Sequence, residues 1–202
     1  KITADSYDDT IHSNGNVTVS GGILSLQTGD DGIHADAEVF IKNGTILIPK
    51  CYEGIEGANI TIDGGTIDLT ASDDGINAAG GEEDESVGDG GPRGMGMGSG
   101  TNTLTINGGT ISVSAAGDGI DVNGSVTMNG GTVVVNGPTS GGDGALDYDK
   151  EFIINGGTLI TAGSAQMNQA PSDSSPQSSI VMAFSNTQEA NSTFTLTDSA
   201  GN

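Results

Sequence analysis

Acidic residues recur along this chain at the start of short motifs, and carboxylates at regular spacing are suited to binding divalent cations. Most copies of the motif read acid-Gly-Ile, and the last, degenerate copy reads Asp-Gly-Ala-Leu at 143–146. The copies begin at Asp9, Asp31, Glu53, Asp74, Asp118 and Asp143. Because the intervals are 22, 22, 21, 44 and 25 residues, the acids mark a repeat of about 22 residues.

Two further polar series keep the same period. One consists of Asp8, Asp30 and Asp73. The other contains Glu56, Asp121 and Asp147, with His12, His34 and Asn77 at matching places. If the repeats stack, like charges about 5 Å apart repel by about 3 kcal/mol at an effective dielectric constant near 20. Only 5 Lys and Arg face 27 Asp and Glu, so basic side chains cannot neutralise these columns.

Calcium is the expected counter-charge, since it takes six to eight oxygen ligands from carboxylates, carbonyls and water. Solvated turn carboxylates and carboxyls protonated in pairs are the alternatives. Because calcium prefers oxygen, the two histidines are expected to be surface residues rather than ligands. The predicted metal ligands are Asp8, Asp9, Asp30, Asp31, Glu53, Glu56, Asp73, Asp74, Asp118, Asp121, Asp143 and Asp147.

The composition excludes several function classes. A net charge of −22 disfavours binding to nucleic acid and to anionic membranes, which need clustered Lys and Arg. No apolar run approaches the roughly 18 residues of a membrane span, so membrane insertion is not expected. Cys51 is the only cysteine, which leaves neither a disulfide framework nor a cysteine-based zinc site.

The repeat predicts an all-β fold. Short bursts of alternating aliphatic residues flank a second glycine series with the same period, at Gly22, Gly44, Gly65, Gly109, Gly131 and Gly157. Two strands and a short third one in about 22 residues describe one coil of a parallel β-helix, and the chain has room for about six to eight coils. Asn107, Asn129 and Asn155, with Asp63, are expected to form a structural amide ladder at the glycine corner.

Three parts of the chain are distinguished. Residues 1–160 are expected to form the coils, with residues 79–101 as a Gly-rich acidic loop inserted at the surface. Residues 161–202 are expected to be a β-rich segment that completes or caps the solenoid or contacts a neighbouring molecule.

Several motifs together resemble the carbohydrate-binding domain family first described from cellulolytic clostridia. They are Asp-Asp-Gly-Ile-Asn-Ala at 73–78, Leu-Thr-Ile-Asn-Gly-Gly-Thr-Ile at 104–111, Gly-Asp-Gly-Ile-Asp at 117–121, Gly-Ala-Leu-Asp-Tyr-Asp at 144–149 and Gln-Ala-Pro-Ser at 169–172. The resemblance implies a right-handed, calcium-containing parallel β-helix, similar in shape to pectate lyases and secreted by a bacterium. It also implies binding to cellulose or acidic polysaccharide, with calcium near Asp30, Asp31, Asp73, Asp74, Asp118 and Asp121.

Three functions follow as hypotheses. The first is non-catalytic binding of a cell-wall or acidic polysaccharide, with calcium bridging to uronates and with Tyr52, Tyr148 and Lys50 beside the sugar. The second is an extracellular filament made by end-to-end stacking, because neither end of the chain shows a capping element. The third, disfavoured, is a polysaccharide lyase that uses Lys50 as its base beside calcium.

Overall fold

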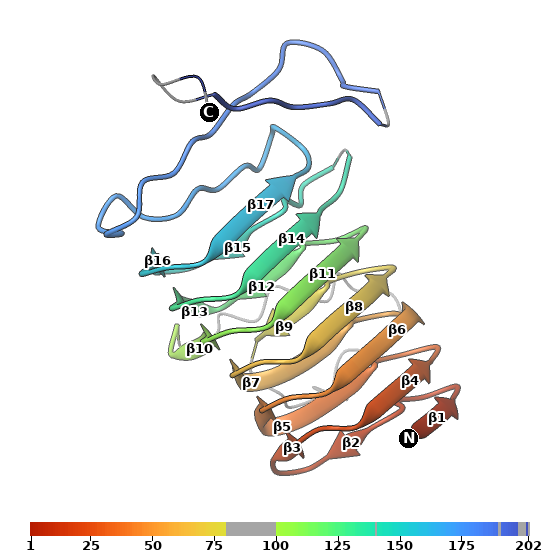
Figure 1. The fold of residues 1–202 in the computed structure, drawn as a ribbon. Helices are drawn as coiled ribbons and strands as arrows, with labels where there is room; N and C mark the ends of the chain where they lie inside the picture. Colours follow the sequence, from red (N-terminus) through yellow and green to blue (C-terminus); the bar gives the residue numbers. More distant parts are fainter. Residues whose placement is uncertain (80–99, 140, 190, 198–200, 202) are drawn as a thin grey trace.

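The protein is a parallel β-solenoid of about six turns (Figure 1). This computed structural model describes residues 1–79, 100–139, 141–189, 191–197 and 201. Strand partners lie about 22 residues apart and every strand pair in the described residues is parallel, for example Thr3 with Ser25. The predicted all-β solenoid and its period are therefore confirmed. No helix in the described part of the chain could cross a membrane.

One face of the solenoid is a seven-stranded sheet. Its strands in spatial order are β1 (Ile2–Asp5), β4 (Ile23–Gln27), β6 (Thr45–Cys51), β8 (Thr66–Ala71), β11 (Thr110–Ala115), β14 (Thr132–Asn136) and β17 (Thr158–Ala162).

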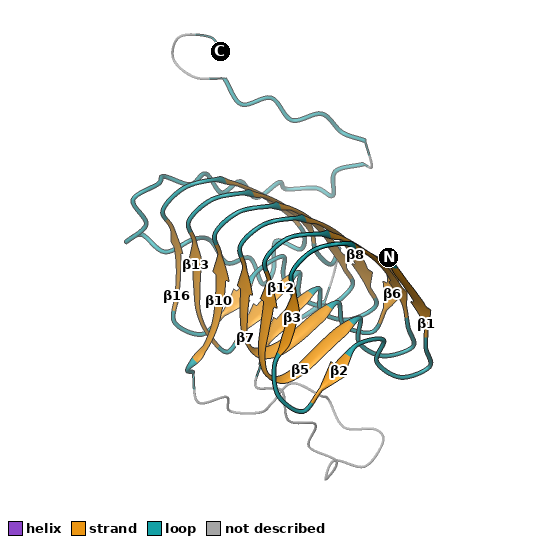
Figure 2. Ribbon diagram, turned by 60° about the horizontal axis from the view of Figure 1, so that its bottom comes forward, coloured by secondary structure: helices purple, strands orange, loops and turns teal. Residues whose placement is uncertain are grey.

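The remaining strands belong to a second, bent sheet, which is visible from below in Figure 2. Its two longest strands, β5 (Ile33–Ile41) and β7 (Ile55–Ile62), run through the bend and pair with shorter strands on both sides of it. The shorter strands are β2 (His12–Ser13), β3 (Val17–Val19), β9 (Ile76–Ala78), β10 (Asn102–Ile106), β12 (Ile120–Val122), β13 (Gly124–Met128), β15 (Asp147–Tyr148) and β16 (Glu151–Ile154).

Alternation in the strands builds a narrow aliphatic core. In β8, for example, residues alternate between exposed and buried along the whole strand. One stack of inward side chains consists of Val17, Val39, Ile60, Leu104, Val126 and Phe152, each buried. Burial of such a side chain contributes about 1.5–3 kcal/mol, so the stacked coils stabilise one another through this core.

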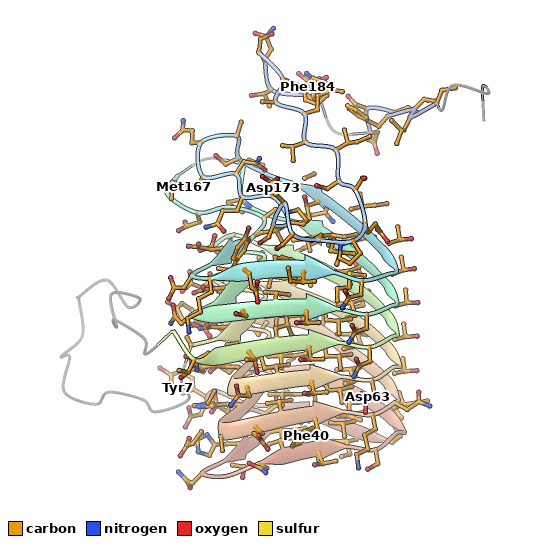
Figure 3. The ribbon with its side chains drawn as sticks, turned by 90° about the vertical axis from the view of Figure 1, so that its left-hand side faces the viewer. Tyr7, Phe40, Asp63, Met167, Asp173 and Phe184 are labelled. Atoms are coloured by element: carbon orange, nitrogen blue, oxygen red, sulfur yellow. The ribbon has the colours of Figure 1, made fainter. Side chains whose placement is uncertain are left out.

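The corner of each coil that contains the second glycine series lies on the edge of the solenoid opposite Tyr7. This glycine corner helps to hold the coils in register. The six glycines of the second series all have positive φ, between 88° and 130°, which a side chain would strain. Beside them, Asn107 Nδ2 donates to Asp63 Oδ1, Asn129 Nδ2 to Asn107 Oδ1 and Asn155 Nδ2 to Asn129 Oδ1, each at 2.8 Å. The predicted structural amide ladder is confirmed, and Figure 3 labels Asp63 at this corner.

The C-terminal segment differs from its β-rich prediction. No described residue after Ala162 belongs to a strand. Instead, polar side chains close the edge of the last coil. The Ser172 amide donates to the Phe152 carbonyl, Ser172 Oγ accepts from the Phe152 amide, and Ser175 Oγ accepts from the Ile154 amide. This part of the segment therefore caps the solenoid through hydroxyl groups, which satisfy strand-edge amides without continuing the sheet.

The rest of the segment extends away from the coils (Figures 1 and 3). It leaves Ile180, Phe184 and Phe194 exposed, with the two phenylalanine rings in an edge-to-face contact. The inserted loop expected at 79–101 lies almost entirely outside the described residues.

Candidate cation-binding face

Two polar columns run side by side along the solenoid. The turn column consists of Asp9, Asp31, Glu53, Asp74 and Asp118, which precede the strands of the bent sheet. The strand column consists of His12, His34, Glu56, Asn77, Asp121 and Asp147, which are directly paired from coil to coil. The predicted vertical alignment of these residues is therefore confirmed.

Backbone contacts explain why the turn column is straight. For the first four acids of the column, the amide that follows the acid donates to the carbonyl of the acid in the next coil, as Gly32 does to Glu53 and Gly75 does to Asp118. The glycine is needed there, because a Cβ at Gly32 would lie 2.6 Å from the Gly54 carbonyl oxygen and 2.7 Å from Ile48 Cδ1. The acid-Gly pair thus allows neighbouring turns to approach closely over the core.

The carboxylates also have a structural role that the sequence analysis missed. Asp9 Oδ1 accepts from the Asp31 amide at 3.0 Å, and Asp31 Oδ1 accepts from the Glu53 amide at 3.2 Å. Farther along, Asp74 Oδ1 accepts from the Asp118 amide at 2.6 Å. One oxygen of each of these carboxylates thus binds the backbone of the next coil, which orients the other oxygen. Most acids of the turn column are Asp rather than Glu, and this preference in the sequence could have indicated the structural role.

The last coil shifts the register by one residue. The Gly144 amide donates to Asp118 Oδ1 at 2.6 Å and its carbonyl accepts from Gly119, so Gly144 holds the place of the column acid. The assignment of Asp143 to the turn column was therefore wrong. Asp143 is exposed and lies one position earlier, because this coil contains 26 residues between equivalent positions. The 26-residue interval of the glycine series had indicated the correct register.

Burial disfavours the charged form of several carboxyl groups in the two columns, all of them from the second coil onward. Burial, with the neighbouring charges of Glu53 and Asp9, raises the pKa of Asp31 to about 7. Burial and the negative charges of Glu53 and Asp121 raise the pKa of Asp74 to about 8. The same cause raises the pKa of Glu53 to about 8, of Asp118 to about 6 and of Asp121 to about 7. A bound dication would remove this penalty.

Asp9 in the first coil behaves in the opposite way. Its burial raises the pKa, but hydrogen bonds from His34 and His12 outweigh that effect and hold the pKa below its usual value. His12 Nδ1 and His34 Nδ1 lie 2.8 Å and 3.1 Å from the same oxygen, Asp9 Oδ2. The expectation that both histidines are surface residues was wrong for His34, which is fully buried because the first coil covers it.

The more buried of two clusters made only of carboxylates lies between the coils of β9 and β12. Single carboxylate oxygens of Asp74, Asp118 and Asp121 lie within 4.8 Å of one another. Asn77 pairs with Asp121 in the strand column, and its Oδ1 is buried without a hydrogen-bond partner among the described residues. Its Nδ2 donates to Glu53 Oε2. Three carboxylates beside an unsatisfied amide oxygen fit the ligand preferences of calcium.

The structure places the other predicted ligands less tightly. Asp8, Asp9 and Asp30 form a second, more exposed oxygen cluster, and Glu56 joins Asp31 and His34 in a third. Asp147 Oδ1 instead accepts from Gln169 Nε2 at 2.6 Å, in the capping segment. Asp73 is half-buried beside the turn column, where its charge raises the pKa of Asp74.

The predicted sugar-contacting residues differ in their surroundings. The Tyr148 hydroxyl donates to the Ala170 carbonyl and its ring packs edge-on against Phe152, so Tyr148 helps to anchor the cap. Tyr52 is half-buried within the flanking column of Asp30 and Asp73, and Lys50 is exposed in β6. Tyr7, adjacent to Asp8, is 96% exposed and projects from the turn-column edge (Figure 3).

These features define a class of protein: a β-solenoid with an acidic, cation-suited face along one edge. Residues 1–91 match the model of a family described as carbohydrate-binding domain-containing protein. That match agrees with the resemblance drawn from the motifs over the first part of the chain. No curated protein and no solved structure matches the chain.

Proposed function

We propose that this solenoid is a non-catalytic module that binds acidic or cellulosic cell-wall polysaccharide through calcium ions held on its acidic face. The single observation that carries the proposal is the cluster of Asp74, Asp118 and Asp121 beside the unsatisfied Asn77 Oδ1. The family match over residues 1–91 supports a carbohydrate partner.

Calcium would be held by carboxylates whose orientation the fold has already set. Asp74 uses one oxygen for the Asp118 amide, and Asp118 uses one for the Gly144 amide. Their second oxygens, with Asp121 and Asn77 Oδ1, would supply the ligands. When bound, the ion supplies positive charge for the carboxylates of a uronate or the hydroxyls of a sugar.

The exposed surroundings would add contacts to the sugar. Tyr7 offers an aromatic face at the same edge, and Tyr52 lies beside the turn column. Lys50 is exposed, so its ammonium group would be available to pair with a carboxylate of an acidic polysaccharide. Extracellular placement would suit this function, since sites of modest affinity fill at the calcium concentrations found outside cells.

Co-sedimentation with polygalacturonate and with cellulose, in calcium and in EDTA, tests the proposal. We expect binding to one or both polysaccharides in calcium and its loss in EDTA. Asp121→Asn should weaken binding, whereas Asp68→Asn should not, because Asp68 is exposed on β8 in the other sheet. Retention in calcium no greater than on an inert resin would overturn the proposal, and release of unsaturated oligosaccharides would instead support the lyase hypothesis with Lys50.

The filament hypothesis stays a prediction with less to support it. End-to-end stacking needs free strand edges at both ends of the solenoid. The hydroxyls of Ser172 and Ser175 already occupy edge amides of β16.

A further inference from the structure

The first two coils bring two imidazoles and one carboxylate to a single point. One potential ligand atom from each of Asp9, His12 and His34 lies within 4.8 Å of the other two. The distances from Asp9 Oδ2 are 2.8 Å to His12 Nδ1 and 3.1 Å to His34 Nδ1. Ligand atoms at this separation need only small movements to surround an ion with bonds of about 2.0–2.2 Å.

The ligand types differ from those of the oxygen-only cluster. Calcium takes oxygen, whereas imidazole nitrogen suits zinc, copper, nickel and iron. Two histidines and one carboxylate are a common ligand set for zinc when a fourth position is left to water or substrate. His12 has a 42% exposed side chain, so an ion could enter from solvent at this end.

The surroundings hold the three groups in place. The Asp31 amide binds Asp9 Oδ1, which turns Oδ2 toward the histidines. His34 is fully buried, and its ring lies edge-on to the His12 ring with the centroids 4.8 Å apart. On the far side of His34, Nε2 faces Asp36 Oδ1 at 3.7 Å, and a carboxylate behind a ligating histidine is the usual support in metal sites.

The local charge also favours a dication. Asp31 Oδ2 and Glu56 Oε2 lie 3.7 Å and 3.9 Å from His34 Nδ1. Both carboxylates are close enough to stabilise added positive charge without displacing the three ligands.

We propose that Asp9, His12 and His34 form a binding site for a transition-metal dication of the zinc class, separate from the calcium sites of the later coils. The competing explanation is that each imidazole simply donates a proton to Asp9 Oδ2. Only the first explanation requires that a metal ion binds. The proposal does not depend on the polysaccharide-binding function.

Cobalt(II) is a suitable probe, because its visible absorption reports nitrogen and oxygen ligation. The 202-residue chain, without a tag, would be stripped with EDTA and titrated with Co²⁺ in excess Ca²⁺, which is expected to fill the oxygen-only cluster of Asp74, Asp118 and Asp121. We expect one Co²⁺ per chain, displaced by Zn²⁺. Because His12 and His34 are the only histidines, their imidazole NMR signals should both shift on Zn²⁺ binding.

Two variants separate the sites. His12→Gln should lower Co²⁺ affinity by more than about tenfold, the scale of losing even a supporting group in a metal site. It should fold normally, since His12 is exposed. Asp121→Asn should leave Co²⁺ binding unchanged. The proposal is overturned if the protein binds no stoichiometric Co²⁺ in the presence of calcium, or if His12→Gln binds Co²⁺ as tightly as the parent protein. It is also overturned if the imidazole NMR signals do not respond to Zn²⁺ and show a proton on each Nδ1.

Discussion

The two ends of the acidic face have the same backbone and different chemistry. At the first coils, His12 and His34 occupy the strand column, and the pKa of Asp9 lies below its usual value. At the later coils, Asn77 and Asp121 take the same places, and burial among carboxylates raises the pKa of Asp74 to about 8. At the first coils the carboxylate therefore has imidazole hydrogen-bond partners, whereas at the later coils the carboxylates lie beside other carboxylates.

This difference shows how a solenoid can vary its ligand preference coil by coil. Strand pairing fixes where each side chain lies, so replacing one residue per repeat changes the ligand set without moving the backbone. The imidazole end suits a nitrogen-seeking metal and the carboxylate end suits calcium. The experiments below test whether the two ends are as independent as this arrangement implies.

Removal of calcium should have the largest effect on stability. An ion present at 100 times its dissociation constant stabilises the folded state by about 2.7 kcal/mol. For a chain of this size that corresponds to a melting-temperature shift of about 5–10 °C. We expect EDTA to lower the melting temperature by this amount and calcium to restore it, with magnesium much less effective. An equal melting temperature in calcium and EDTA would refute calcium binding at the carboxylate end.

Charge removal at the two ends should have opposite signs in the cation-free protein. Asp9→Asn should destabilise by about 1–3 kcal/mol, because His12 and His34 lose a charged acceptor. Asp121→Asn should stabilise the protein in EDTA at pH 8, because it removes one of several repelling charges, and destabilise it in calcium. Urea unfolding of both variants in EDTA and in calcium provides the measurement. If both variants change the free energy of unfolding in the same direction in EDTA, the proposed difference between the two ends is contradicted.

The pH dependence follows from the same contrast. A carboxyl whose pKa is raised on folding binds a proton more tightly in the folded state, so it contributes stability at low pH that is lost as the pH rises. For Asp31, Glu53 and Asp74 the loss spans the range from about pH 4 to about pH 8. In EDTA the free energy of unfolding should therefore fall between pH 5 and pH 8. Asp9 contributes the opposite slope, at pH values below its usual pKa of 3.8.

Calcium provides the control for the pH experiment. Bound dications would lower the pKa values of their carboxylate ligands, so the fall in stability between pH 5 and pH 8 should be smaller in calcium than in EDTA. Equal slopes in the two conditions would mean that calcium does not contact these carboxylates.

The sequence predicted the periodic part of this molecule well, because the solenoid repeats each position. Two series with one period were sufficient to infer the coils, the glycine corner and the two columns. The errors fall where the repeat breaks. Asp143 was displaced by a 26-residue coil, and the cap uses the hydroxyls of Ser172 and Ser175 in place of strands.

The details of the site depended on side-chain direction, which spacing does not reveal. Nothing in the pattern distinguishes buried His34 from exposed His12, since both occupy the same position of the repeat. The unsatisfied Oδ1 of Asn77 likewise arises because its Nδ2 is committed to Glu53. Such commitments follow from the three-dimensional neighbours of each residue.

Asp147 should give the smallest effect, because it lies at the far end of the strand column. It aligns with Asp121, and its Oδ1 accepts from Gln169 Nε2 in the cap. Asn at this position keeps an acceptor for Gln169. Asp147→Asn should therefore change the free energy of unfolding by less than about 1 kcal/mol. Its calcium affinity, measured by isothermal titration calorimetry, should remain close to that of the parent protein.

A loss of calcium affinity in Asp147→Asn comparable to that of Asp121→Asn would extend the carboxylate end by one coil. It would also return Asp147 to the set of ligands that the sequence predicted. Unchanged affinity would place the boundary of the calcium-binding region between the coils of β12 and β15. That boundary is expected physically, because Gly144 replaces the turn-column acid in the last coil and leaves Asp147 without a carboxylate beside it in that column.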